Sequence, residues 1–156
     1  MVAFCVVVCL AVLAASAAAT NVQQCPDKSF ENLSENVQLS PCKKPPCRLK
    51  RGTDQAIMIH FTPTEDLDDV RNSVTANVAG LNVPFVGVDG ASVCDKIHTD
   101  DGEKASCPLK AGTTYTYNDT FPVLAFYPPI RTNVHWGLQD KNQVDLICFE
   151  VRVQIT

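Results

Sequence analysis

The sequence predicts an all-β protein, folded as an antiparallel sandwich in a single domain. Apolar residues after residue 20 recur with a period of two rather than 3.6, as on strands with one buried face. Turn-forming glycines, prolines and asparagines separate these runs, and no repeat or low-complexity linker divides the chain. Six of the eight cysteines follow residue 20, which is typical of small secreted domains held by disulfides.

The expected strands are short and number about seven. In order they are 37–39, 55–62, 73–86 with bends at Gly80 and Pro84, 113–117, 123–127, 132–138 and 144–155. The last is the clearest, because every second residue from Ile147 to Ile155 is apolar. The one helix-like stretch is 65–79, where β-branched valines favour a polar turn at its acidic front and then a strand.

Residues 1–19 are expected to be a cleavable signal peptide, which leaves residues 20–156 as the mature domain. An apolar run ends in small residues, with Ala17 and Ala19 at the positions that precede a cleavage site. A retained membrane anchor is the alternative, since the run is near the shortest length that spans a bilayer. The small-residue tail and the missing basic flank favour cleavage before Thr20, and therefore secretion.

The remaining cysteines predict three disulfides. They are Cys25, Cys42, Cys47, Cys94, Cys107 and Cys148. Six cysteines allow many pairings, and sequence alone does not choose among them. The spacing favours two local loops, Cys42 with Cys47 and Cys94 with Cys107, which leaves the first and last cysteines to join the ends of the domain. Zinc is a poor alternative, because no C-x-x-C pair occurs and no histidine stands at zinc-finger spacing.

Charge and surface motifs narrow the possible partners. A formal net charge of −4 argues against nucleic acid. The basic residues within 43–51 form a positive patch suited to anionic lipid head groups or an acidic partner, although a solvated loop is the simpler interpretation. The acidic run 65–69 does not match a calcium-binding loop, and we expect a solvated turn there. Asn32 and Asn118 each begin a glycosylation sequon.

No constellation for catalysis is present, so we expect no enzyme, cofactor or metal. The sequence lacks a nucleophile elbow, a zinc-protease motif, a phosphate-binding glycine loop and a dinucleotide fingerprint. His60 has the opposite parity to the apolar residues of its strand and is expected to face solvent. It is interpreted, with His98 and His135, as a surface or structural histidine, because no acid and nucleophile accompany it.

Four blocks of sequence carry a family resemblance. They are Leu39-Ser40-Pro41-Cys42 with Pro46-Cys47, Asn82-Val83-Pro84-Phe85, Phe126-Tyr127-Pro128-Pro129-Ile130 leading to Trp136-Gly137-Leu138-Gln139-Asp140, and Asp140-Lys141-Asn142-Gln143 through Cys148-Phe149-Glu150 to Val153-Gln154-Ile155. Any one block is weak, but the ordered set with six cysteines covers nearly the whole mature chain. In this order they resemble the Niemann–Pick type C2 family of secreted lipid carriers, whose module is the ML, or lipid-recognition, domain.

The resemblance implies an immunoglobulin-like sandwich whose two sheets splay to leave an apolar cavity between them. It implies the disulfides Cys25–Cys148, Cys42–Cys47 and Cys94–Cys107, in agreement with the spacing. It also places four residues at the mouth or wall of the cavity. These are Phe85, Val123, Tyr127 and the adjoining Trp136. Each is equally acceptable as an ordinary core residue of a sandwich.

The function that the resemblance implies is a non-catalytic, monomeric carrier of a sterol or fatty acid, which releases its cargo to a membrane or receptor. Two departures leave the ligand class open. Val86-Gly87-Val88 replaces the proline-rich run of the best-known sterol-binding members, and the loop between Cys94 and Cys107 is longer than theirs. The arthropod members of the family look at least as close.

Other functions stay open at this stage. The chain is also suited to be a lipid-recognition module of innate immunity, a carrier of chemosensory semiochemicals, or a structural sandwich with a solid core. Its destination is extracellular fluid or a lysosome-like compartment.

Overall fold

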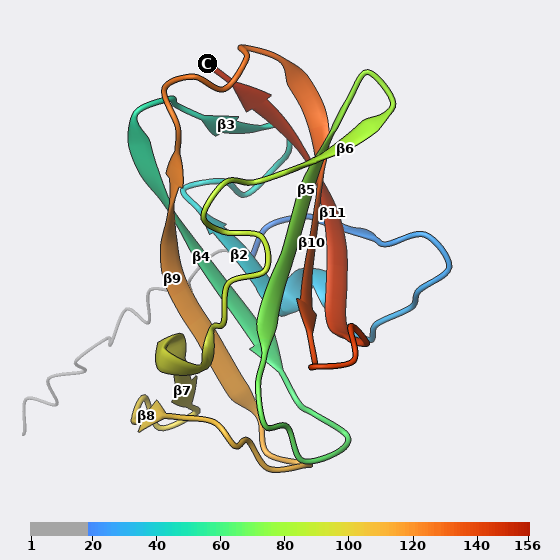
Figure 1. Ribbon diagram of the computed structural model, residues 1–156, viewed down its shortest axis with the longest axis vertical. Coiled ribbons are helices and arrows are strands. Elements are labelled where there is room, and N and C mark those ends of the chain that lie inside the picture. The colour runs from blue at the N-terminus through green and yellow to red at the C-terminus, as the bar shows by residue number, and fades with distance from the viewer. Residues whose placement is uncertain (1–18) are drawn as a thin grey trace, which may run out of the picture.

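A computed structural model describes residues 19–156 and shows two facing β-sheets (Figure 1). The strands are β1 (Gln23–Gln24), β2 (Val37–Ser40), β3 (Cys47–Leu49), β4 (Thr53–Phe61), β5 (Arg71–Val78), β6 (Leu81–Pro84), β7 (Ile97–Thr99), β8 (Lys104–Ala105), β9 (Tyr115–Val123), β10 (Arg131–Gln139) and β11 (Asp145–Ile155). Two 3-10 turns, η1 (Leu33–Glu35) and η2 (Cys94–Lys96), lie in the connections. Nearly all of the predicted signal peptide, residues 1–19, lies outside the described residues. Within the described part, no helix has the length and apolar character needed to span a bilayer.

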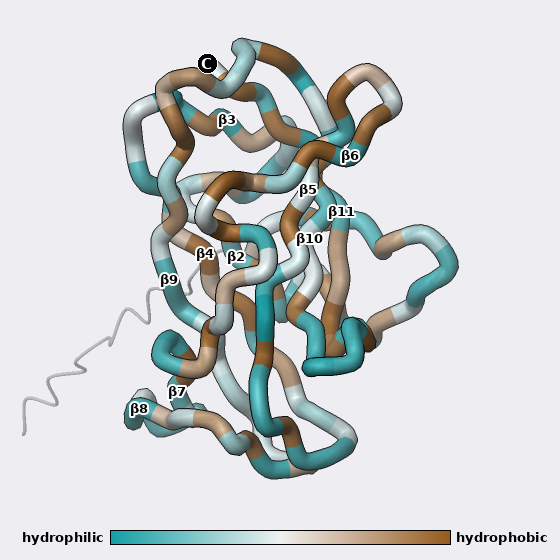
Figure 2. The backbone as a smooth tube through the Cα atoms, in the orientation of Figure 1, coloured by the Kyte–Doolittle hydropathy of each residue, from teal (hydrophilic) through white to brown (hydrophobic). Residues whose placement is uncertain are grey.

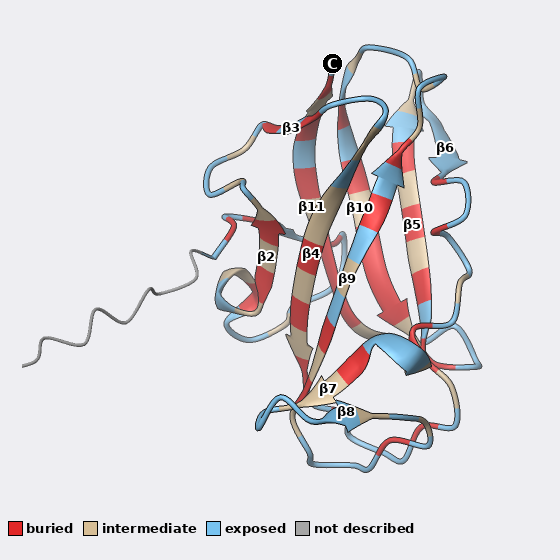
Figure 3. Cartoon of the chain, turned by 90° about the vertical axis from the view of Figure 1, so that its left-hand side faces the viewer, coloured by how far each residue is buried: buried red, intermediate tan, exposed pale blue. Residues whose placement is uncertain are grey.

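The two sheets have distinct strand orders. The first is β1-β11-β10-β5-β6, with β3 also paired to β11, and the second is β2-β4-β9-β7-β8. Every pairing is antiparallel except that of β3, which runs parallel to the last residues of β11. Figure 3 shows β4 and β9 crossing in front of β5, β10 and β11. The all-β antiparallel sandwich predicted from the sequence is therefore confirmed.

The core lies between the sheets and follows the period-two pattern. In β11 the residues from Ile147 to Ile155 that face the other sheet are buried, as the alternation predicted. In β4 the buried side chains are Ile57, Ile59 and Phe61. The same alternation is visible as brown and teal along the strands in Figure 2 and as red and pale segments in Figure 3. Each strand thus has one face that favours burial, which fixes how the sheets stack.

Two predicted strands have the wrong limits. Residues 123–127 are not a strand, because β9 ends at Val123 and the chain turns through 124–130, where the Tyr127 amide donates to the Leu124 carbonyl at 3.1 Å. Two following prolines, which have no N–H, prevent further pairing. Residues 73–86 are a hairpin of β5 and β6, turned at Ala79 and Gly80 with φ of 52° and 83°.

Strand β9 continues through residues 118–122, which the sequence predicted to separate two strands. It pairs with β4 along its whole length, from Tyr115 opposite Phe61 to Val123 opposite Thr53. Its middle contains polar residues, so the predicted run 113–117 seemed to stop there. Asp119 even points toward the other sheet, half-buried. Cross-strand pairing overrides local composition at this point.

The three disulfides have the predicted pairing. Cys25–Cys148 joins the N-terminal segment to β11 across 123 residues, whereas Cys42–Cys47 and Cys94–Cys107 close loops of 5 and 13 residues. The third disulfide anchors η2 to the segment after β8. The long cross-link constrains the unfolded chain most, because the entropy of loop closure grows with loop length.

Candidate functional site

Two small apolar hollows lie at the end of the sandwich where β6 and the C-terminus meet. The outer hollow has a volume of about 50 Å³. It is lined by Ala76, Val78, Val83, Pro84, Phe85, Tyr127, Pro128, Ile130 and Ile155. The inner hollow has a volume of about 10 Å³. It is lined by Leu39, Leu49, Phe85, Phe121, Val134, Trp136, Val151 and Val153, which come from both sheets and the segments beside them.

Phe85 belongs to both hollows and separates them. It is 4% exposed, and its ring meets Tyr127 at 5.4 Å and Phe121 at 6.3 Å between centroids, both edge to face. Phe121 in turn contacts Trp136 at 5.0 Å. A continuous series of aromatic contacts therefore leads from the outer hollow to the centre of the sandwich.

The predicted site residues are only partly brought together. Phe85 and Tyr127 line the outer hollow, and Phe85 and Trp136 line the inner one. Val123 is 1% exposed and lines neither. Phe121 was not singled out from the sequence, although it shares the inward face of β9 with Val123. The signal that identifies it is the alternation of buried residues along that strand.

The size of the hollows has a direct consequence. A cavity needs about 10–15 Å³ to hold one water molecule. The two hollows therefore have room for only a few waters, and neither is as large as a lipid chain. Binding of a lipid between the sheets requires the aromatic rings to shift or the sheets to separate further. A lipid-sized cavity therefore stays a prediction, and the hollows indicate where it would form.

Hydrogen bonds of Tyr127 to Val86 and Arg51 lie beside the outer hollow, and we call this contact the clasp. The Tyr127 hydroxyl accepts a hydrogen bond from the Val86 amide at 2.9 Å, and an Arg51 guanidinium N–H donates to the Tyr127 carbonyl at 3.4 Å. Phe126, 74% exposed, packs edge to face on the Tyr127 ring at 5.4 Å. The turn 124–130 is thereby tied to the segment after β6.

A buried hydrogen-bond network lies just beyond the inner hollow. The Trp136 indole N–H donates to Asn72 Oδ1 at 3.0 Å, and the Asn72 amide donates to the Tyr117 hydroxyl at 3.1 Å. The Tyr117 hydroxyl donates to Asp119 at 3.3 Å. Burial, more than the nearby carboxylate, raises the pKa of Tyr117 above its ordinary value, so the hydroxyl keeps its proton.

The histidines are placed as structural or surface groups. His60 lies on the outer face of β4, where its Nδ1 is 2.9 Å from the Thr116 hydroxyl. His135 lies against the Cys25–Cys148 disulfide and 3.8 Å from Glu150. In residues 19–156, each of the two clusters with potential metal ligands contains both sulfurs of a disulfide. Such sulfurs carry no thiolate, the form that binds metal.

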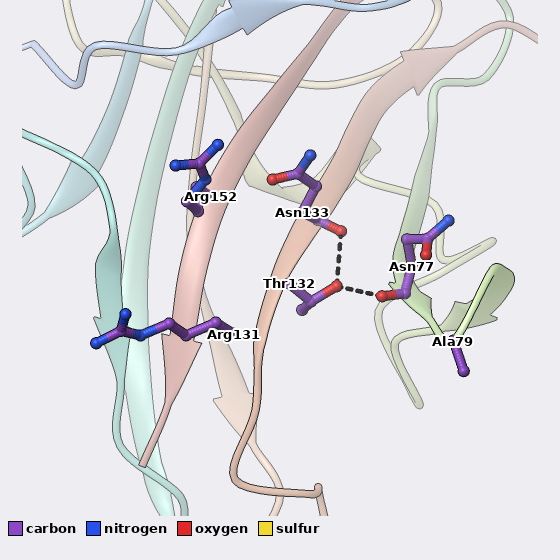
Figure 4. A pocket seen from close by; sticks show the side chains of 6 residues that line it. All are labelled: Asn77, Ala79, Arg131, Thr132, Asn133 and Arg152. Atoms are coloured by element: carbon purple, nitrogen blue, oxygen red, sulfur yellow. Dashed lines mark hydrogen bonds between the residues drawn. The ribbon is translucent and has the colours of Figure 1, made fainter.

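The outer face of the first sheet has a groove of about 420 Å³ near the same end (Figure 4). Its lining includes Arg131, Asn133 and Arg152, and the Thr132 hydroxyl donates to the Asn77 carbonyl at its floor. The predicted basic patch 43–51 is continuous with this groove, because Arg48 and Arg131 both lie opposite Gln154 on β11. The positive surface is therefore larger than the sequence indicated.

The two candidate glycosylation sites, Asn32 and Asn118, are both exposed. Their use stays a prediction.

The chain is similar to known proteins along nearly all of its described length. A family model described as the ML domain matches residues 19–155. The NPC intracellular cholesterol transporter 2 homolog a of Drosophila melanogaster is 32% identical over 155 residues, covering 99% of each chain. The ecdysteroid-regulated 16 kDa protein of Manduca sexta is 32% identical, covering 92% of this chain and 94% of that protein.

A solved structure has the same fold. The Niemann-Pick type C2 protein from the Japanese carpenter ant superposes with a TM-score of 0.63 at 22% identity, covering 78% of this chain and 89% of that one. The ML family consists of lipid-binding proteins rather than enzymes. With a family match along the described chain and a relative 32% identical over almost its full length, this protein belongs to the ML-domain family, together with the Niemann–Pick type C2 proteins.

Proposed function

We propose that the protein binds one sterol or fatty acid between its sheets and carries it without chemical change. The observation that supports this most directly is the series of aromatic contacts from Tyr127 through Phe85 to Trp136, with an apolar hollow on either side of Phe85. The driving force is burial of apolar surface. A chain of about 16 carbons gains roughly 13 kcal/mol before the losses on binding.

The binding mode follows from the lining. The outer hollow is lined by apolar side chains, so the cargo needs few polar anchors. Its apolar end would lie toward Trp136, and its oxygen atoms would stay near the clasp between Tyr127 and Val86, in reach of water. Names of relatives that mention cholesterol transport favour a sterol, and a fatty acid is the second candidate.

The direct test is recovery of the cargo. Mature protein secreted from eukaryotic cells would be extracted with solvent, and the extract analysed by mass spectrometry for sterols and fatty acids. We expect one class at close to one molecule per protein. Phe85→Ala and Tyr127→Ala should reduce the amount, while Val144→Ala, which trims an exposed valine outside both hollows, should not. No extractable lipid, together with no uptake of added sterol or fatty acid, would overturn the proposal.

Binding of ligands added to the purified protein separates the rival roles. A receptor module of innate immunity would retain lipopolysaccharide and neither candidate cargo. A semiochemical carrier would retain a small volatile lipid. Release of the protein into the medium, with Thr20 near its new N-terminus, would support cleavage of residues 1–19 and secretion.

We further propose that the cargo is released at an anionic acceptor membrane. Five exposed basic residues without a carboxylate partner in the described chain lie around the end that holds the hollows. They are Arg48, Lys50, Arg51, Arg131 and Arg152. Lys43 and Lys44 are also exposed and lie further along the sheet, where Lys44 lines a separate pocket with Glu150. Leu81, Val83, Val86 and Phe126 are exposed apolar residues. They belong to β6, to the segment after it and to the turn after β9, and Figure 1 shows β6 at the same end as β3. Apolar contact and positive charge together bind membranes that either alone would hold weakly.

Transfer kinetics test this acceptor. Arg131→Glu with Arg152→Glu should slow transfer of a fluorescent sterol to vesicles containing phosphatidylserine and leave transfer to neutral vesicles unchanged. Lys104→Glu is the matched control, because Lys104 is exposed, has no ion-pair partner in the described chain and lies in β8 at the opposite end. Equal transfer rates to both vesicle types would favour a protein receptor instead.

A further inference from the structure

The two sheets are joined through a buried polar contact near the start of β5 and of β9. Tyr117 projects from β9 in the second sheet and Asn72 from β5 in the first, and the Asn72 amide donates to the Tyr117 hydroxyl at 3.1 Å. Both residues are buried, at 1% and 5% exposure. The Asn72 carbonyl oxygen accepts the Trp136 indole N–H at 3.0 Å. Asn72, which is held by Tyr117, therefore holds the Trp136 indole in one orientation.

This contact lies between a loosely packed region and a dense one. Trp136 lines the inner hollow, whereas neither Asn72 nor Tyr117 lines the inner or the outer hollow. Trp136 pairs with Val74 on β5, and Asn72 lies two residues before Val74, on the same inward face and further from the hollows. Leu138 and Ile59, which pair with Asn72 and Tyr117, are fully buried. The network therefore lies between the hollows and a tightly packed part of the core.

Moving the indole would be costly in a way that moving Phe85 is not. Displacement of Trp136 leaves its N–H, and then the Asn72 amide, without partners in an apolar interior, which is unfavourable. Phe85 has no polar side-chain atom to lose. Trp136 should therefore limit how far a lipid that enters past Phe85 can extend into the core.

We infer that Asn72 and Tyr117 are positioning residues that hold Trp136 as the fixed end of the lipid cavity and so limit the length of the cargo. The inference rests on the proposed function and goes beyond it by naming what selects among lipids. Phe149 lies opposite Trp136, and Ile155, six residues along β11, lines the outer hollow. Six residues of strand span about 20 Å.

The length of the cavity predicts the longest fatty-acid chain that it can enclose. With carbon–carbon bonds of about 1.5 Å, a zigzag chain of about 16 carbons covers a similar distance. Affinity for saturated fatty acids should rise about fourfold per CH₂ and then level off near this length. Carbons beyond the limit would stay in water at the mouth and add nothing.

The experiment is a chain-length series on the mature protein. Displacement of a fluorescent fatty acid by saturated acids of increasing length would locate the plateau for the wild type and for Asn72→Leu with Tyr117→Phe. The double variant removes the Asn72 oxygen that accepts the indole N–H and the Tyr117 hydroxyl that holds Asn72. The chain length at which affinity levels off should then increase by at least two carbons. Tyr117→Phe alone keeps the shape of the ring and should give a smaller shift in the same direction, so a double variant that fails to fold leaves the test intact.

Tyr115→Phe is the matched control. Tyr115 is a buried tyrosine on the same inward face of β9, and its hydroxyl accepts the Lys110 amide at 2.9 Å, away from Trp136. It should lower thermal stability as much as Tyr117→Phe does without moving the plateau. A merely structural role for the network predicts the same result for both variants.

The outcomes distinguish a failure of this inference from a failure of the proposed carrier function. If the wild type binds sterols but no fatty acid, the same series is run with sterols of different side-chain length. An identical plateau in the wild type and in Tyr117→Phe and the double variant would overturn the inference while the carrier function stands. A wild type that binds neither lipid class would overturn both.

Discussion

The Tyr127 hydroxyl accepts a hydrogen bond from the Val86 amide at 2.9 Å, which ties the turn after β9 to the segment after β6. These are the two chain segments between which a lipid would pass to reach Phe85. The bond is exposed, so it can exchange with water when the segments separate. We interpret it as the clasp whose opening limits the rate of lipid entry and exit.

Tyr127→Phe should speed both uptake and release. It removes the hydroxyl and keeps the ring against Phe85, so the barrier falls while the apolar lining is unchanged. An intramolecular hydrogen bond contributes up to about 1 kcal/mol, which corresponds to at most roughly fivefold in rate for this exposed bond. Stopped-flow measurement with a fluorescent fatty acid gives both rate constants. Unchanged rates, with Tyr115→Phe as the reference, would show that the clasp does not control access.

The single tryptophan offers a direct measure of cargo orientation. All tryptophan emission comes from Trp136, since the sequence contains no other. Hexadecanoic acid with bromine on its last carbon should quench this emission more strongly than the acid with bromine beside the carboxyl group. The reason is that the apolar end is expected to lie against the indole. Stronger quenching by the second compound would mean that the cargo enters carboxyl first.

The stabilising contribution of Asp69 should be lost at acidic pH. The Ser92 hydroxyl donates to it at 2.6 Å, and Arg71 forms an ion pair with it at 2.7 Å. The Ser92 hydrogen bond, helped by the Arg71 charge, lowers the pKa of Asp69 below its ordinary value. The folded state therefore favours the ionised carboxylate. Its contribution is complete above the unfolded pKa of about 3.9 and is lost as the pH falls through the lower folded pKa.

The measurement is the free energy of unfolding in denaturant between pH 7 and pH 2. Asp69→Asn should be less stable than the wild type near pH 5, and the difference should shrink toward pH 2. Asp100→Asn, at an exposed turn position, serves as the control and should show no such convergence. A constant difference at every pH would mean that the side chain acts through packing rather than through its charge.

The disulfides should differ in their effect on stability. By loop-closure entropy, removing Cys25–Cys148 with paired alanines should cost roughly 5 kcal/mol, and removing Cys42–Cys47 roughly 2 kcal/mol. The separations of 123 and 5 residues produce this order. Thermal unfolding of the two double variants checks it. The reverse order would mean that local geometry at Cys42, rather than chain entropy, dominates.

Patterns that are local in the chain could be read from the sequence. The alternation from Ile147 to Ile155 correctly gave both the strand and its inward face, because a period of two is a property of each strand alone. The six cysteines after residue 20 indicated three disulfides, and the family resemblance gave their pairing. The resemblance also named Phe85, Val123, Tyr127 and Trp136 as residues of a lipid cavity, and that assignment stays a prediction.

The tertiary structure decided what depends on which strands become neighbours. Strand β9 continues through Asp119 because β4 pairs with it, and no local signal gave that. Asn72 looks like an ordinary polar residue at the start of a strand, yet it joins Trp136 to Tyr117 across the two sheets. Sequence fixes the faces of strands through short-range periodicity, whereas contacts between distant strands arise only when burial of those faces brings the sheets together.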